Sequence, residues 1–137
     1  MRYPILATDY DGTLATEGHV DRSTVAALHR YKQAGGQIFL VTGRRLPQLQ
    51  QVFPQLDLCD RVVAENGALL YEPSRDFERA IAPVPPPQFA KTLAARGVEP
   101  LAIGRVIVAA WQPHEQTVTE TIRDLDLDLQ IILNKRA

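Results

Sequence analysis

The stretch that decides the fold is ATDYDGTLA at residues 7–15, directly after the apolar run YPIL at residues 3–6. Side chains two positions apart on a strand point to the same face, so Asp9 and Asp11 are predicted to project together from the end of a strand. Two such charges about 4 Å apart repel by roughly 4 kcal/mol at an effective dielectric constant near 20. A cation, a shared proton or a greater separation must therefore offset this repulsion.

The neighbouring residues predict a parallel α/β sheet. Residues 3–10 and 38–41 are almost continuously apolar, as expected of parallel strands that are covered on both faces. Between them lies a predicted helix that begins after the N-cap Asp21 and ends at Gly35-Gly36. A strand, a helix and a strand at this spacing predict a βαβ unit with a right-handed crossover.

The same pattern continues along the chain. A second helix is predicted over residues 47–53 and a third strand over residues 61–64. Asn66-Gly67, followed by the apolar residues 68–71, is typical of a tight type I′ hairpin turn. The predicted fold class is therefore α/β, with a parallel Rossmann-like sheet and helices on both of its faces.

A proline-rich segment at residues 83–87 predicts a domain boundary. Beyond it, the apolar pattern predicts a short helix, a strand over residues 101–111, a second helix and a half-buried strand over residues 125–133. We therefore predict two domains, a core over residues 1–82 and a small α+β segment over residues 83–137.

The composition excludes several classes of protein. A net charge of −1 and a pI of about 6.3 provide no basic surface for nucleic acid. Cys59 is the one cysteine, which excludes an internal disulfide and a thiolate metal cluster and fits a reducing compartment. We expect no membrane span, because no stretch reaches about 18 apolar residues, and no signal peptide. The composition thus predicts a soluble cytoplasmic protein.

The candidate chemistry gathers where the first two predicted strands end. Ligand sites of open parallel sheets lie beyond the carboxyl ends of the strands. Two carboxylates, a hydroxyl and backbone amides exposed beside glycines suit a divalent cation that holds a phosphoryl group, so we expect Mg²⁺ here. The residues expected to converge are Asp9, Asp11, Gly12, Thr42, Gly43 and Arg44.

Three motifs in this order resemble those of the haloacid dehalogenase superfamily of phosphohydrolases: DYDGT at residues 9–13, VTGR at 41–44 and ENGA at 65–68. The sequence is most similar to the Cof-type branch, which carries a mixed α/β cap and includes sugar-phosphate phosphatases. The resemblance covers the core half, and the residues after the prolines resemble the start of such a cap. It implies a HAD-like fold and a Mg²⁺-dependent phosphohydrolase for a small phosphorylated metabolite.

The resemblance also implies roles for single residues. Asp9 is the expected nucleophile that forms an aspartyl-phosphate, and Asp11 the general acid and then the base toward water. Both are expected Mg²⁺ ligands, Asp11 through its backbone carbonyl, and Thr42 is expected to hydrogen-bond the phosphoryl group. The other residues that the motifs place around the substrate are Gly12, Thr13, Gly43, Arg44 and Asn66.

The sequence departs from the family pattern downstream. The family's third motif is a lysine and its fourth an acidic pair at the metal site, both beyond the cap. Here Lys135 follows a predicted strand of the cap, and the acidic residues among 124–128 alternate like the solvent face of a strand. The resemblance therefore implies a truncated chain with weak activity of its own. We also expect homo-oligomers through an uncovered sheet edge.

Two other functions stay open on the residues alone. One is a non-catalytic module that keeps the phosphate pocket for binding or regulation. The other is a receiver-type domain, which also phosphorylates an aspartate with Mg²⁺; its aspartate follows a later strand than Asp9 does, which disfavours it. Asn66-Gly67 is interpreted first as a hairpin turn and only second as part of a binding site.

Overall fold

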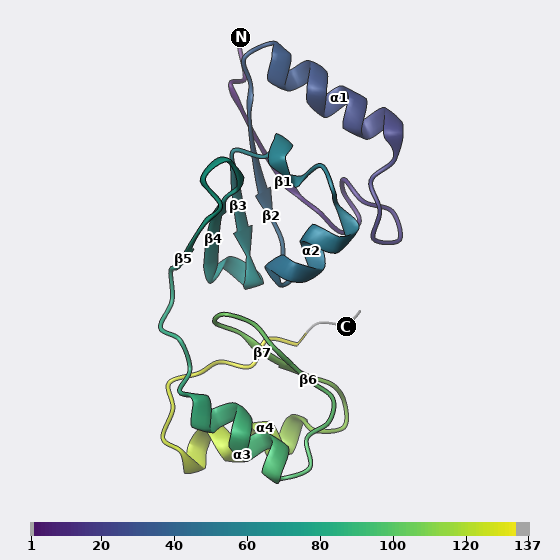
Figure 1. The fold of residues 1–137 in the computed structure, drawn as a ribbon. Helices are drawn as coiled ribbons and strands as arrows, with labels where there is room; N and C mark the ends of the chain where they lie inside the picture. The colour runs from purple at the N-terminus through teal and green to yellow at the C-terminus, as the bar shows by residue number, and fades with distance from the viewer. Residues whose placement is uncertain (1, 134–137) are drawn as a thin grey trace. The chain divides into compact units, whose positions relative to one another are not determined.

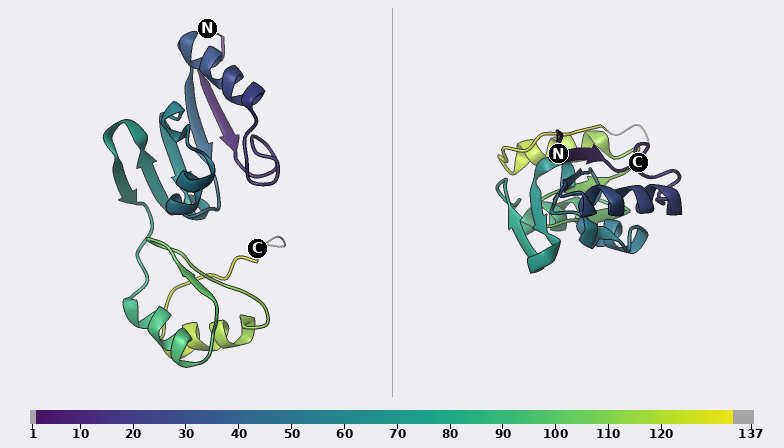
Figure 2. Two further views of the ribbon diagram at one scale, coloured as in Figure 1. Left: turned by 45° about the vertical axis from the view of Figure 1, so that its right-hand side comes forward. Right: turned by 90° about the horizontal axis from the view of Figure 1, so that it is seen from above.

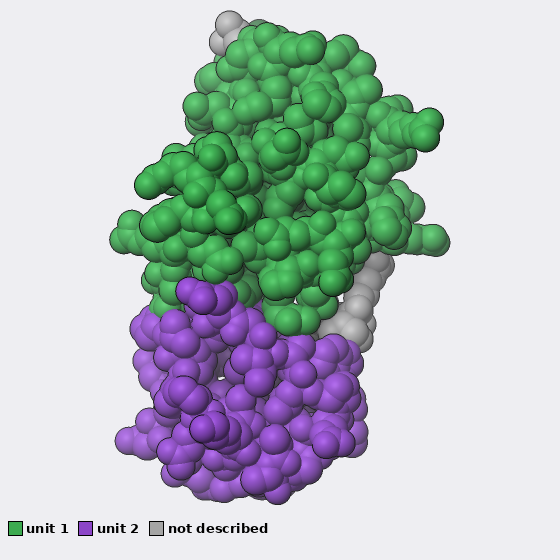
Figure 3. Space-filling view, in the orientation of Figure 1, with its two compact units in different colours: residues 1–82 green, residues 83–137 purple. Residues whose placement is uncertain are grey.

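The chain forms two compact units, residues 1–82 and residues 83–137 (Figure 3). The computed structural model describes residues 2–133 of the chain. No helix among these residues has both the length and the apolar character needed to cross a membrane.

Unit 1 contains a five-stranded mixed sheet (Figure 1). Its strands, in spatial order, are β1 (Ile5–Asp9), β2 (Gln37–Val41), β3 (Arg61–Ala64), β4 (Leu69–Glu72) and β5 (Phe77–Ala80). The first three are parallel, and β4 and β5 are antiparallel to their neighbours. The βαβ prediction and the α/β fold class are confirmed.

Two helices connect the parallel strands, α1 (Arg22–Gln33) and α2 (Leu46–Val52). The predicted N-cap is confirmed, because Asp21 Oδ1 accepts a hydrogen bond of 2.8 Å from the Thr24 N–H. Short 3₁₀ helices lie at Leu56–Leu58, Glu65–Gly67 and Pro73–Arg75.

Both helices cover the same face of the sheet (Figure 2, right). Leu28 of α1 and Leu49 of α2 pack in one core with Leu40 and Val62 of the sheet. Helices were predicted on both faces of the sheet, whereas α1 and α2 both lie on one face. The steps from β1 to β2 and from β2 to β3 run in the same direction across the sheet, so two right-handed crossovers lie on one side.

The other face of the sheet is only partly covered by the described residues. Ile5 is 51% exposed and Val41 45%, and β1 alternates between exposed and half-buried residues at the edge of the sheet. The prediction that β1 is covered on both faces was therefore wrong for this part of the chain. A run of apolar residues shows that a strand can be buried on both faces. It does not show which other part of the protein covers each face.

The hairpin from β3 to β4 is confirmed, but its turn is longer than predicted. The strand pair closes at Ala64 and Leu69, so four residues connect the strands in place of two. Glu65, Asn66 and Gly67 all have positive φ angles, of 52°, 58° and 96°. The Asn-Gly signal thus marked a left-handed turn correctly but not its length. Strand β5, which pairs with β4, was not predicted.

Unit 2 consists of α3 (Pro87–Ala95), β6 (Leu101–Ile103), β7 (Val108–Ala110) and α4 (Glu115–Asp124). Its core comprises Phe89, Leu93 and Val98. The predicted single strand over 101–111 is instead an antiparallel hairpin. The Gly104 N–H donates to the Ile107 carbonyl at 2.8 Å and closes its turn.

The predicted last strand of unit 2 is absent from residues 127–133, which form no regular secondary structure. Leu125, Leu127 and Leu129 nevertheless pack against the core of the unit. The alternation therefore predicted the half-buried side chains correctly as far as Leu129, whereas Ile131 and Leu133 are exposed. Alternation alone cannot supply a strand that pairs with this segment.

Candidate active site

The carboxyl ends of β1 and β2 lie side by side. Asp9, the last residue of β1, is in register with Val41, the last residue of β2. Asp9 is exposed, and the Thr13 hydroxyl lies 3.5 Å from its Oδ2 as a hydrogen-bond donor. Thr42 follows directly after Val41, so the candidate nucleophile and the candidate phosphoryl ligand are brought to the same edge of the sheet.

Asp11 lies in the loop after β1. The strand ends at Asp9, and Tyr10 is fully buried. The loop turns at Gly12, where φ is +76° and the N–H donates to the Ala15 carbonyl at 3.0 Å. Asp11 therefore lies outside the strand, and the two-residue period of strand side chains does not set its direction. The expectation that this period makes Asp9 and Asp11 project together was wrong.

Arg44 pairs with Asp11 through two hydrogen bonds. Nε lies 2.8 Å from Oδ2 and Nη2 lies 2.9 Å from Oδ1, across a separation of 33 residues. The hydrogen bonds that Arg44 donates to Asp11 raise the pKa of Arg44, although burial acts in the opposite direction. The two strand ends thus converge as expected. Arg44 thus offsets the charge of Asp11 within the described chain, and the expected cation between the two aspartates stays a prediction.

The side chain of Arg44 lies over the Tyr10 ring. The guanidinium carbon is 5.7 Å from the ring centroid, within the range of a cation–π contact. The Tyr10 hydroxyl donates to the Gly18 carbonyl at 2.8 Å, which ties the ring to the loop before α1. Burial raises the pKa of Tyr10, so its hydroxyl stays a neutral donor at physiological pH.

Thr42 is buried at the base of the loop after β2, with 3% of its surface exposed. Its hydroxyl oxygen accepts a hydrogen bond of 3.1 Å from the Arg44 N–H, and its own N–H donates to the Val63 carbonyl at 2.8 Å. A hydroxyl that accepts a bond in this way can still donate its proton to an incoming oxygen.

The turn after β3 packs against this loop. The Glu65 N–H donates to the Arg44 carbonyl at 3.0 Å, and the Asn66 N–H donates to the Thr42 carbonyl at 3.2 Å. A Cβ added at Gly43 would lie only 2.6 Å from Asn66 Oδ1, so a larger residue at position 43 would displace the Asn66 side chain. Glu65 is also buried, with 1% of its surface exposed, and this was not predicted from the sequence. The ENGA motif contains Glu65, but no local pattern indicates that its side chain is buried.

The oxygen atoms near the end of β1 fit part of a site for a hard cation such as Mg²⁺. The Asp9 carboxylate is exposed there, whereas the Asp11 carboxylate is engaged by Arg44. The backbone carbonyl of Asp11 is the second oxygen that could bind the ion. Within residues 2–133, no group of three or more His, Cys, Asp or Glu side chains is placed to hold a metal. These two oxygen donors would form only part of the ligand set of such an ion.

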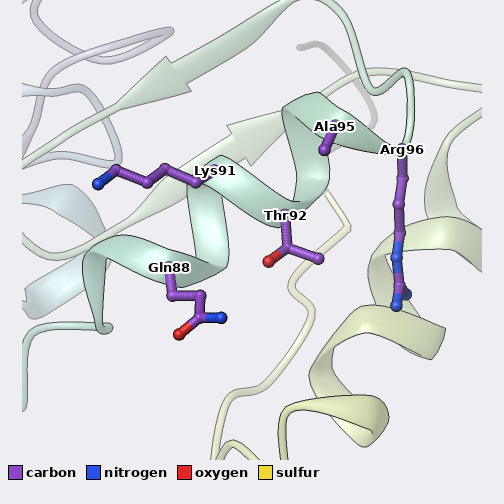
Figure 4. A pocket seen from close by; sticks show the side chains of 5 residues that line it. All are labelled: Gln88, Lys91, Thr92, Ala95 and Arg96. Carbon is purple, nitrogen blue, oxygen red and sulfur yellow. The ribbon is translucent and has the colours of Figure 1, made fainter.

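Other candidates from the sequence lie away from these contacts. Asp124 pairs with Arg96 of unit 2 at 3.0 Å, and Lys135 lies outside the described residues. A surface hollow of about 430 Å³ runs along α3 (Figure 4). None of the predicted site residues lines it; its lining residues are Gln88, Lys91, Thr92, Ala95 and Arg96.

Comparison with known proteins identifies the family. The model of the haloacid dehalogenase-like hydrolase family matches residues 6–105. The chain therefore belongs to the haloacid dehalogenase-like hydrolase family. This confirms the resemblance to Cof-type phosphohydrolases that the motifs at 9–13, 41–44 and 65–68 indicated.

Two curated relatives are phosphatases. The chain is 36% identical over 98 residues to a phosphoglycolate phosphatase of Metallosphaera sedula, covering 67% of this chain and 44% of the relative. It is 34% identical over 73 residues to the pyridoxal phosphate phosphatase YbhA of Escherichia coli, covering 53% of this chain and 27% of the relative. The matches thus span less than half the length of either relative.

A solved structure shares the fold. It is a haloacid dehalogenase-like hydrolase from Bacteroides thetaiotaomicron, with a TM-score of 0.59 and 14% identity. The match covers 96% of this chain and 52% of that one. At this identity the likeness supports the fold alone.

Proposed function

We propose that the chain provides the nucleophile and the phosphoryl-binding residues of a Mg²⁺-dependent phosphatase that acts on a small phosphorylated metabolite. The observation that carries this proposal is the register between Asp9 and Val41, which brings Asp9 and the following Thr42 to the same edge of the sheet. Two phosphatase relatives of the family, named for phosphoglycolate and pyridoxal phosphate, support the substrate class.

The proposed reaction has two steps. In the first, an oxygen of Asp9 attacks phosphorus, the bond to the ester oxygen breaks, and Asp11 gives a proton to the leaving alcohol. In the second, Asp11 takes a proton from water as the water attacks the aspartyl-phosphate, which releases phosphate and restores Asp9. The Thr42 hydroxyl donates to a phosphoryl oxygen, and the backbone around Gly12, Thr13 and Gly43 surrounds the group.

Asn66 has a supporting part in this proposal, because its side chain covers Gly43 and its N–H holds the Thr42 carbonyl. The Asp9 carboxylate and the Asp11 carbonyl would hold Mg²⁺. When bound, the ion would neutralise charge on the phosphoryl oxygens. In terms of domains, we propose that residues 1–82 form half of a catalytic core and residues 83–137 part of a cap.

The test is the hydrolysis of p-nitrophenyl phosphate with and without Mg²⁺. We expect slow turnover that depends on Mg²⁺ and stops when the ion is chelated. Asp9→Asn should lower the rate by about a thousandfold or more, because it removes the nucleophile. The matched control is Asp57→Asn, which removes the same charge from an exposed residue outside the site. Equal rates for Asp9→Asn and wild type would exclude Asp9 as the nucleophile.

A specific observation favours one alternative, a non-catalytic phosphate-binding module. In the structure Arg44 donates two hydrogen bonds to the Asp11 carboxylate, so the proposed general acid is already engaged by a partner within the chain. Phosphate binding that needs Thr42, without turnover of the ester, would support the module over the enzyme.

A further inference from the structure

The guanidinium group of Arg44 forms a binding site for a carboxylate, and the chain fills it with its own Asp11. Two N–H donors of Arg44 meet two oxygens of Asp11, at 2.8 and 2.9 Å. This is the bidentate geometry in which arginine binds carboxylates and phosphates selectively, because the donors are planar and permanently charged.

Arg44 is held in place from several directions. Its N–H donates to the Thr42 hydroxyl and its carbonyl accepts from the Glu65 N–H. Its guanidinium group lies over the buried Tyr10 ring, 5.7 Å from the centroid. A side chain positioned in this way loses little conformational entropy when it binds an anion.

Asp11 is the more exposed partner of the pair. Its side chain is 49% exposed, against 28% for Arg44, and it sits on a loop beyond the end of β1. Ion pairs this exposed contribute little net free energy, because water solvates both charges when the pair opens. Another carboxylate can therefore replace Asp11 on Arg44 at low cost.

We propose that Arg44 determines substrate specificity by binding a carboxylate on the leaving group of the phosphoester, which takes the place of Asp11. This inference rests on the proposed function and narrows its substrate class to phosphate esters of small hydroxy acids. Asp11 is the residue proposed to contact the leaving oxygen. A carboxylate one or two carbons from that oxygen therefore lies within reach of Arg44.

The exchange has a consequence that a purely structural ion pair lacks. While Asp11 is bound to Arg44, no outside carboxylate can bind there. The apparent affinity of Arg44 for an outside carboxylate is therefore its intrinsic affinity multiplied by the fraction of molecules in which Asp11 is not bound to Arg44. Neutralising Asp11 should therefore strengthen the binding of carboxylate-bearing ligands specifically, and removing Arg44 should weaken it specifically.

The experiment uses two non-hydrolysable probes with the same number of carbon atoms, 3-phosphonopropionate and propylphosphonate. The first ends in a carboxylate where the second ends in a methyl group. Their dissociation constants are measured by calorimetry on the full chain in saturating Mg²⁺. We expect wild type to bind 3-phosphonopropionate about tenfold more tightly than propylphosphonate. Arg44→Gln should bring this ratio close to one, and Asp11→Asn should raise it above the wild-type value.

Two controls match these variants. Asp57→Asn removes one negative charge from an exposed residue, and Arg61→Gln removes an arginine that pairs with Glu72 at 3.3 Å. Both should keep the wild-type ratio. Thermal unfolding monitored by circular dichroism shows whether each variant is folded. If Arg44→Gln does not fold, the ratio of the two dissociation constants for Asp11→Asn tests the proposed role of Arg44.

The outcomes separate this inference from the proposed function. If neither phosphonate binds the wild-type chain, the phosphate pocket is refuted, and the inference falls with it. If both bind with equal dissociation constants, or if Asp11→Asn leaves the ratio unchanged, the pocket stands and the role given to Arg44 is wrong.

Discussion

At the scale of single residues, charge at the candidate site is balanced by a partner distant in the sequence. The sequence posed a problem of repulsion between Asp9 and Asp11, and a cation was the expected answer. In the structure, the Arg44 guanidinium group is already paired with Asp11. Asp9, at the end of the strand, is exposed, and it is the residue that we propose as the nucleophile.

Asp60 is a second carboxylate whose hydrogen-bond partners determine the direction of its pKa shift. Its Oδ2 accepts hydrogen bonds from Lys32 Nζ at 2.7 Å and from the Ile38 N–H at 2.8 Å. Burial raises the pKa of Asp60, but these two hydrogen bonds outweigh burial and hold it below its ordinary value. Asp60 lies directly before β3. Its ion pair with Lys32 links it to the end of α1, and its hydrogen bond from Ile38 links it to the start of β2.

This arrangement predicts a pH dependence of stability. A carboxyl whose pKa is lowered by folding adds stability above its unfolded pKa, and this stability is lost as the pH falls through the folded pKa. Asp60→Asn should therefore lower the free energy of unfolding by about 1 kcal/mol at pH 7. The difference from wild type should disappear as the pH drops below about 4, measured by urea unfolding across this range.

The control for this prediction is Asp57→Asn, three residues earlier and exposed. It should change the free energy of unfolding little at either pH. A deficit of Asp60→Asn that persisted undiminished at low pH would show that the ion pair is not its cause.

At the scale of elements, local signals predicted the helix ends and the strand pairs of β1 to β4 well, but they predicted the later strands poorly. Asp21 caps α1 as predicted, because an N-cap depends on a side chain and a backbone amide three residues away. By contrast, residues 101–111 form a hairpin, and residues 127–133 form no strand. Strands need partners elsewhere in the chain, and one periodic segment contains no information about them.

The turn from α1 into β2 provides a prediction at this scale. A Cβ at Gly36 would overlap the ring of Tyr31, whose hydroxyl is bound to the Tyr3 carbonyl at 2.9 Å. Gly36→Ala should therefore lower the free energy of unfolding by about 1–3 kcal/mol, through overpacking against the ring. Urea denaturation at equilibrium measures this loss.

A double variant tests the cause. With Tyr31→Ala the obstructing ring is gone, so adding Gly36→Ala should cost almost nothing more. If the two losses simply add, the destabilisation by Gly36→Ala arises from the backbone and not from Tyr31.

At the scale of the whole molecule, the arrangement of the sheet leaves apolar surface open on the described chain. Strand β1 is an edge strand, and its first residue, Ile5, is 51% exposed. Exposed strand edges with apolar side chains tend to pair with another chain. We therefore propose that the chain self-associates through β1.

Light scattering at micromolar concentration tests this proposal. We expect a dimer or larger species for wild type and a monomer for Ile5→Lys, because a lysine on an edge strand opposes pairing. The matched control is Ile103→Lys in β6 of unit 2, where the isoleucine is 57% exposed. It should keep the wild-type mass, and a monomeric wild type would contradict the proposal.

The sequence by itself determined the order of the elements from β1 to β4, the cap at Asp21 and the positions of Asp9 and Thr42 at strand ends. These follow from side-chain periodicity and short-range hydrogen bonds, which act within a few residues. Only the tertiary structure decided that Arg44 pairs with Asp11, that Glu65 is buried and that both helices share one face. Those features depend on where the loops bring distant residues, and no local pattern in the chain contains that information.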